Sequence, residues 1–72
     1  MSQHIIRVHH NTKIYPIEVT RNFRGTWVFW RNGSEYQFER VEGEWILTKG
    51  TLPEKYLYQI ITELENLYHA TK

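Results

Sequence analysis

The dipeptide Asn32-Gly33 lies between two segments rich in aromatic residues, and it constrains the fold more than any other feature of the chain. Both central residues of a type I′ turn need a positive φ, which Asn and Gly adopt readily. A two-residue loop here predicts a β-hairpin with these facing pairs: Arg31 and Ser34, Phe29 and Tyr36, and Trp27 and Phe38. Aromatic cross-strand pairs on one face are typical of a sheet that buries that face.

Further turn signals divide the rest of the first 50 residues into strand segments. They lie at residues 10–13, 22–25, 42–43 and 49–51. Two-residue loops at 11–12 and 42–43, with an odd-length loop over 22–24, predict these pairs: Ile6 and Ile17, Val8 and Tyr15, Val19 and Trp27, Ile17 and Phe29, Phe38 and Leu47, and Arg40 and Trp45.

This register places the large apolar side chains of five strands on one continuous face. Its members are Ile6, Val8, Tyr15, Ile17, Val19, Trp27, Phe29, Tyr36, Phe38, Trp45 and Leu47. A slip of one residue in any strand would turn its apolar side chains to the other face, so agreement among four separate turns favours a β-meander. Pro16 cannot donate a ladder hydrogen bond, which predicts that its strand is exposed on one side near that point, or bulged.

From Leu52 to about His69 the apolar residues recur at spacings of three and four, as on one face of an amphipathic helix. They are Tyr56, Leu57, Ile60, Ile61, Leu64, Leu67 and Tyr68. Thr51 and Glu54 match a capping box with Thr51 as the N-cap, and Pro53 is tolerated in the first turn.

A helix about 10 Å across cannot cover five flat strands that lie about 4.8 Å apart, so we expect the sheet to curl around it. The predicted fold class is α+β, a five-stranded antiparallel curved β-meander wrapped on one C-terminal α-helix (βββββα). We expect residues 1–72 to form a single small globular domain.

Composition excludes several classes of function. The formal net charge of +1 lacks the strongly basic balance of a dedicated double-stranded DNA binder. Apolar runs fall well short of the roughly 18 residues that span a membrane. The chain has no cysteine, which is compatible with the cytosol. We expect a cytoplasmic protein that makes no membrane contact.

Catalytic constellations are missing from the sequence. The chain contains no Asp and no Cys, and its serines are Ser2 and Ser34, so a Ser/His/Asp or Cys/His arrangement cannot be built. Paired carboxylates would have to be glutamates, which we expect to be solvated at the 42–43 turn and on the outer side of the helix: Glu42, Glu44, Glu63 and Glu65. We therefore expect a non-enzymatic protein with no catalytic residues and no cofactor.

The histidines do not predict a metal site. His9 and His10 are adjacent in a strand and point to opposite faces, while His4 and His10 share a face about 20 Å apart at about 3.3 Å per residue. His69 near the helix C-terminus could join one of them, although a cation there is also favoured by the helix dipole. We expect no metal.

The second face of the sheet suggests where the chain touches a partner. Val28 and Trp30 point away from the predicted core, opposite Gln37 and Glu35. With three isoleucines of the same face they predict a protein-partner or homodimer contact formed by Val28, Trp30, Ile5, Ile14 and Ile46. In the alternative interpretation these are separately exposed apolar residues that need no partner.

A further alternative is weak, salt-dependent binding of single-stranded nucleic acid. Aromatic rings interleaved with cations on a curved sheet bind bases by stacking. The candidate residues are Arg7, Arg21, Phe23, Arg24 and Trp30. A loop that folds Phe23 back on the core would remove one stacking ring, and Arg31, on the core face at a strand end, is explained by its charged head reaching water.

Overall fold

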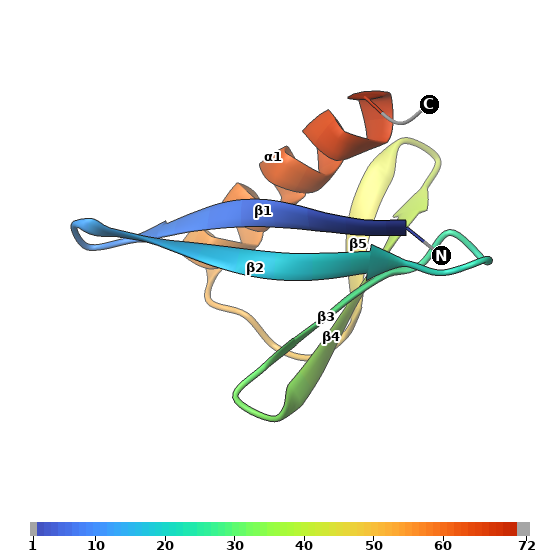
Figure 1. Cartoon of the computed structure of the whole chain (residues 1–72). Coiled ribbons are helices and arrows are strands. Elements are labelled where there is room, and N and C mark those ends of the chain that lie inside the picture. Colours follow the sequence, from blue (N-terminus) through green and yellow to red (C-terminus); the bar gives the residue numbers. More distant parts are fainter. Residues whose placement is uncertain (1, 71–72) are drawn as a thin grey trace.

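The computed structural model describes residues 2–70 and shows one open antiparallel sheet followed by a single helix (Figure 1). The elements are β1 (Ser2–His10), β2 (Lys13–Arg21), β3 (Trp27–Arg31), β4 (Ser34–Val41), β5 (Glu44–Lys49) and α1 (Glu54–Ala70). The strands lie in the sheet in chain order, so each pairs with its neighbours in sequence. The predicted βββββα meander is confirmed.

The turns have the backbone geometry that their residues predict. Asn32 and Gly33 have φ of 53° and 79°, and Glu42 and Gly43 have φ of 51° and 83°, as type I′ turns require. The predicted pairings of β1 with β2, of β3 with β4 and of β4 with β5 all occur, with a register shift between Gln37 and Phe38 on β4.

The core lies between the predicted apolar face of the sheet and the apolar face of α1. Its buried members are Ile6, Val8, Ile17, Val19, Trp27, Phe29, Phe38, Ile60 and Leu64. The Phe29 ring stacks on Tyr36 with centroids 4.9 Å apart. The Phe38 ring centroid lies 6.2 Å from that of Phe29 on the same face. The face assignment made from the turns is therefore confirmed.

The predicted register between β2 and β3 is wrong by two residues. Trp27 pairs with Arg21 instead of Val19, and Val28 pairs with Thr20. The loop that joins the strands spans residues 22–26, and the Asn22 side chain closes it by accepting hydrogen bonds from two backbone N–H groups. Since side chains alternate with a period of two, this shift leaves every side chain on its predicted face.

The predicted helix start is also wrong. α1 begins at Glu54, and the Pro53 carbonyl accepts hydrogen bonds from the N–H groups of Tyr56 and Leu57, which places Pro53 at the N-cap. Leu52 precedes Pro53, and a residue before proline is disfavoured in the helical region. This disfavours a first helical turn that starts directly after Thr51, as the capping box predicted. The Glu54 carboxylate accepts a hydrogen bond from the Tyr58 hydroxyl.

One end of the sheet is fastened to α1 through the free edge of β1. The Gln59 side chain accepts a hydrogen bond from the His9 N–H at 2.7 Å and donates one to the His9 carbonyl at 3.0 Å. The Arg7 N–H donates to Glu63 at 3.2 Å. These side chains satisfy backbone groups that would otherwise offer a pairing edge to another chain.

The opposite side of the sheet, formed by β4 and β5, is attached to α1 through Glu65. Arg40 donates two hydrogen bonds to this carboxylate, at 3.2 Å and 3.1 Å, and the Trp45 indole N–H donates a third. The His69 ring nitrogen Nε2 lies 2.9 Å from the carboxylate, and the Arg40 guanidinium lies 4.2 Å from the Tyr68 ring centre.

The expectation that Glu63 and Glu65 are solvated residues of the outer helix face is therefore wrong. Both glutamates lie outside the apolar face of the helix, as predicted. They are not simply solvated, because the curled sheet reaches both sides of α1. Strand edges and strand side chains thus meet both glutamates.

Hydrogen bonds from Arg40, and then from Trp45, lower the pKa of the Glu65 carboxyl from an ordinary 4.5 to about 2. A carboxyl with a lower pKa in the folded state stabilises the fold above its unfolded pKa. That contribution is lost as the pH falls through the folded pKa. The contact between α1 and the β4–β5 hairpin should therefore weaken in acid.

Glu65→Gln should lower the free energy of unfolding near neutral pH, because the ion pair with Arg40 and its hydrogen bonds are weakened. The difference from the wild type should shrink as the pH falls from about 4.5 to about 2. Urea unfolding followed by circular dichroism over this range measures it. A difference of constant size at neutral and acidic pH would contradict the assignment.

Trp27 and Trp30, three residues apart on β3, form a matched pair for testing the two faces. Trp27 is 1% exposed and Trp30 is 63% exposed. Trp27→Ala should cost about 3–5 kcal/mol of unfolding free energy, whereas Trp30→Ala should stay within about 0.5 kcal/mol of the wild type. Equal losses in urea unfolding would show that Trp30 belongs to the core.

Candidate binding cleft between β2 and β3

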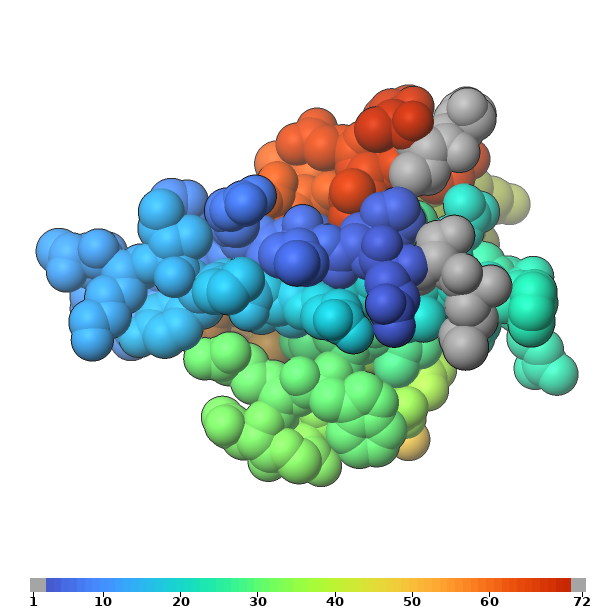
Figure 2. Space-filling model, viewed as in Figure 1, coloured from blue at the N-terminus to red at the C-terminus, as the bar shows by residue number. Residues whose placement is uncertain are grey.

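β2 and β3 pair at one end and separate at the other. In the described chain, two residue pairs join them, Thr20 with Val28 and Arg21 with Trp27. Beyond these pairs the β1–β2 hairpin and the β3–β4 hairpin run apart toward their tips (Figure 1). Figure 2 shows the two hairpins as separate lobes on that side of the molecule. Hollows lined by residues of both strands form a cleft between β2 and β3.

The backbone of β2 presents hydrogen-bonding groups to this cleft. The N–H groups of Arg7 and His9 on β1 point to α1. Because backbone groups alternate in direction along a strand, the even-numbered residues of β1 form the backbone hydrogen bonds with the odd-numbered residues of β2. The backbone groups of the even-numbered residues Ile14, Pro16 and Glu18 then point to the cleft, where the register with β3 offers them no partner.

Pro16 lies on this open edge and has no N–H to present. It pairs with Arg7 across the β1–β2 ladder at a position where the backbone groups of β2 face away from β1. The prediction that the strand is exposed on one side near Pro16 is confirmed. Proline on an open edge also limits uncontrolled pairing with other chains.

On the outer face of the sheet the cleft opens into a hollow of about 520 Å³. Pro16, Thr20, Val28 and Trp30 line it, among other residues. Trp30 projects into solvent, while Val28 is half-buried. The hollow thus combines an exposed indole with the unpaired edge of β2.

The charged neighbour of Trp30 is held by other side chains. Glu35, opposite Trp30, accepts hydrogen bonds from Lys49 at 2.6 Å and from Gln37 at 3.1 Å. These bonds, that of Lys49 above all, lower the pKa of the Glu35 carboxyl. The carboxylate beside the indole is therefore paired on the protein.

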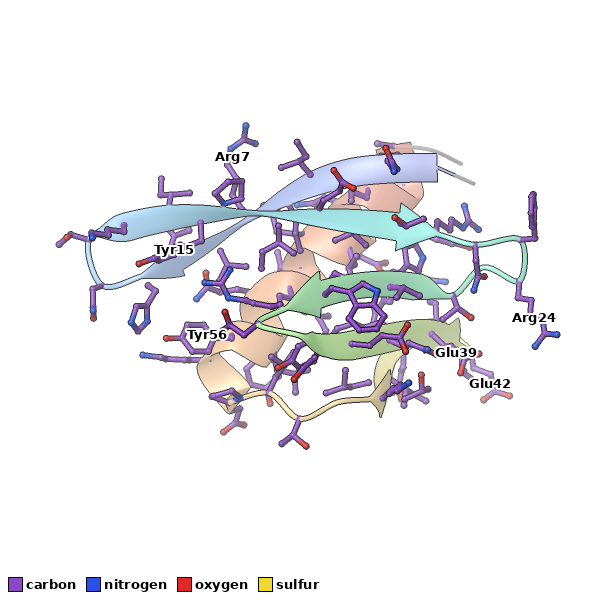
Figure 3. The ribbon with its side chains drawn as sticks, turned by 60° about the horizontal axis from the view of Figure 1, so that its bottom comes forward. Arg7, Tyr15, Arg24, Glu39, Glu42 and Tyr56 are labelled. Atoms are coloured by element: carbon purple, nitrogen blue, oxygen red, sulfur yellow. The ribbon has the colours of Figure 1, made fainter. Side chains whose placement is uncertain are left out.

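On the inner face, next to α1, the cleft opens into a second hollow of about 290 Å³. Aromatic and aliphatic side chains form most of its lining, which includes Tyr15, Tyr36, Tyr56, His10, Phe29 and Arg31. Tyr15 and Tyr56 come from β2 and from the first turn of α1, and both lie at the end where the hairpins separate (Figure 3). Ile17, Phe29 and Arg31 line both hollows, which are therefore two sides of one cleft.

Polar groups converge at the rim of the inner hollow. The Tyr56 hydroxyl forms a hydrogen bond with Nδ1 of His10, and their ring centres lie 5.5 Å apart. The Arg31 guanidinium lies 5.3 Å from the Tyr15 ring centre. This arrangement suits an apolar or aromatic side chain flanked by polar groups.

The structure brings together two of the five predicted partner-contact residues. Val28 and Trp30 line the outer hollow from neighbouring outward positions of β3. Three others are exposed but lie elsewhere: Ile5, Ile14 and Ile46.

Polar cross-strand partners interrupt the predicted apolar surface. Ile5 lies opposite Glu18, Ile46 lies opposite Glu39, and Ile14 lies near the tip of the β1–β2 hairpin. The five residues consequently do not form one contiguous patch, and the cleft beside Val28 and Trp30 is the concave part of this face.

The predicted nucleic-acid residues also divide into groups. Arg21, Phe23 and Arg24 lie at or within the β2–β3 loop, with Phe23 exposed and not folded back on the core. Arg7 lies above the middle of the β1–β2 hairpin in Figure 3, well away from Arg24 at the far right. Trp30 lines the cleft instead of the loop.

The inner hollow was not predicted from the sequence, because its tyrosines occupy positions that were expected to lie in the core. Tyr15, Tyr36 and Tyr56 are only partly buried. A usable signal was that three predicted core positions carry tyrosine instead of phenylalanine, since a phenol hydroxyl needs water or a hydrogen-bond partner. Glu65 gave no comparable signal.

The chain matched no protein-family model, no curated protein and no solved structure. Within residues 2–70, no helix is long and apolar enough to cross a membrane. The same residues hold no group of three or more His, Cys, Asp or Glu side chains placed to share a metal ion.

Proposed function

We propose that this chain is a small non-enzymatic interaction domain that binds an extended segment of a protein partner in the cleft between β2 and β3. The observation that carries the proposal is the unpaired edge of β2 beside the exposed indole of Trp30. An open strand edge is a template for pairing with another chain, and exposed tryptophan is enriched among residues that dominate binding energy.

The two hollows support an extended partner in particular. Successive side chains of a strand point to opposite faces. A segment paired with the edge of β2 would direct one set of side chains toward Trp30 and Pro16 in the outer hollow. The alternate set would enter the aromatic inner hollow near Tyr56 and Arg31. Backbone bonds would then supply affinity, and the hollows would supply specificity.

The geometry favours modest affinity. Pro16 removes one donor from the edge of β2, and the open part of the strand is short. Interfaces of small area are typical of weak or transient complexes. A second copy of the chain is the alternative occupant of the cleft, so the homodimer stays a prediction. The cytoplasmic location also stays a prediction.

Selection of random peptides displayed on phage against the immobilised protein tests the proposal. Peptides enriched on the wild type should bind Trp30→Ala at least about 30-fold more weakly, the loss typical of a dominant interface residue. Glu18→Pro should also weaken binding, because it removes an N–H that faces the cleft and leaves the β1–β2 ladder intact.

Ile46→Ala is the matched control, since Ile46 is an exposed apolar residue of the same sheet face outside the cleft. It should leave peptide affinity unchanged. Failure to enrich any peptide, or enriched peptides that bind all three variants equally, would contradict the cleft as the binding site. Sedimentation of the wild type and Trp30→Ala shows whether a second copy fills the cleft.

A further inference from the structure

A second site lies at the end of the strands away from the cleft, where the β2–β3 loop meets the β4–β5 turn. The loop, residues 22–26, is held by its own hydrogen bonds. The Asn22 side chain accepts from the N–H groups of Arg24 at 2.9 Å and Thr26 at 3.0 Å. Backbone bonds of 3.0 Å also join Asn22 to Thr26 and Gly25 to Asn22. The loop is therefore a defined platform.

The platform presents Phe23 to solvent. Its side chain is 92% exposed, the largest exposure among the exposed large apolar side chains of the described chain. Because four hydrogen bonds fix the surrounding backbone, this exposure is built into the loop conformation. An aromatic ring held away from the core in this way offers both of its faces to a ligand.

Arginines surround a hollow of about 390 Å³ next to the loop residues that follow Phe23 in the chain. Arg21, Arg24 and Arg40 line it, together with Glu42. Arg40 is bound to Glu65, and the Arg21 guanidinium lies 5.4 Å from the Trp27 ring centre.

Among the described residues, the structure records no hydrogen bond or ion pair to the Arg24 guanidinium. Figure 3 shows Arg24 pointing away from the sheet at the loop tip, with Glu42 at the neighbouring turn. With Arg40 paired to Glu65, two arginines face one glutamate, so the hollow carries excess positive charge.

We infer that this loop and hollow bind single-stranded nucleic acid, with a base stacked on Phe23 and the adjoining phosphates held by Arg24 and Arg21. Stacking on a ring beside a positively charged groove is the general mode by which proteins bind single strands. Guanidinium groups suit phosphate oxygens because they donate two parallel hydrogen bonds. This site shares no residue with the outer hollow beside Trp30, apart from the loop residue Asn22.

The same observations argue against other anionic partners. A membrane-binding surface usually buries several apolar side chains in the lipid, whereas the neighbours of Phe23 in the loop are Asn22, Arg24 and Gly25. A duplex keeps its bases stacked inside, so it cannot offer one to Phe23. The proposed ligand therefore has accessible bases as well as phosphates.

Fluorescence anisotropy with a labelled single-stranded oligodeoxynucleotide of about ten mixed-sequence nucleotides tests the inference at low salt. With Arg21 and Arg24 engaged, the slope of log K against log[salt] should be about −1.4. Phe23→Ala should weaken binding roughly 5- to 150-fold, the loss expected when one stacked base loses its ring. Arg24→Ala should reduce the magnitude of the slope by about 0.7.

Arg7→Ala is the matched control for Arg24→Ala, because it removes the same charge from an exposed position elsewhere on the sheet. It should leave the affinity within about twofold of the wild type, which is small beside the loss from one base contact. Trp30→Ala should also bind normally, so this site and the cleft can fail independently. Circular dichroism confirms that each variant is folded.

Any one of the following results would overturn the inference. They are no binding at low salt, equal losses for Arg7→Ala and Arg24→Ala, equal affinity for a duplex of the same length, and insensitivity to Phe23→Ala. Binding of phosphatidylserine vesicles through Phe23, without oligonucleotide binding, would assign the loop to a membrane instead and would also overturn it.

Discussion

The attachment of α1 to both ends of the sheet is the constraint on which the rest of the structure depends. Gln59 and Glu63 bind the edge of β1, and Glu65 binds Arg40 and Trp45 on β4 and β5. Five strands about 4.8 Å apart are wider than one helix about 10 Å across, so the sheet can meet both sides of the helix only by curling. The sheet bends where its pairing is shortest, between β2 and β3.

The candidate cleft follows from that bend. Each hairpin packs on α1 from its own side, so β2 and β3 remain paired next to their loop and separate toward the hairpin tips. The outer edge of β1 is covered by side chains of α1, whereas the inner edge of β2 faces the cleft beside Trp30. An open stretch of backbone thus lies in the middle of the sheet, between β2 and β3. There aromatic side chains flank it on both faces.

Much of the fold could be predicted from the sequence because turn residues and strand periodicity are local properties. Asn32-Gly33 and Glu42-Gly43 determine the register of β3, β4 and β5, and alternation then assigns every face. The β2–β3 register could not be predicted, since it depends on how the Asn22 side chain closes a five-residue loop. Pro16 and Trp30 indicated an open, partner-facing region, but the cleft depends on the splay of two hairpins around a helix, which no local pattern encodes.

Amide hydrogen exchange measured by NMR tests the open edge most directly. The N–H groups of Glu18 and Trp30 face the cleft, while those of their neighbours Ile17 and Phe29 bond to β1 and β4. We expect rapid exchange at Glu18 and Trp30 and strong protection at Ile17 and Phe29. Protection of Glu18 and Trp30 equal to that of their neighbours would show that β2 and β3 are paired along their whole length in solution. This result would contradict the cleft.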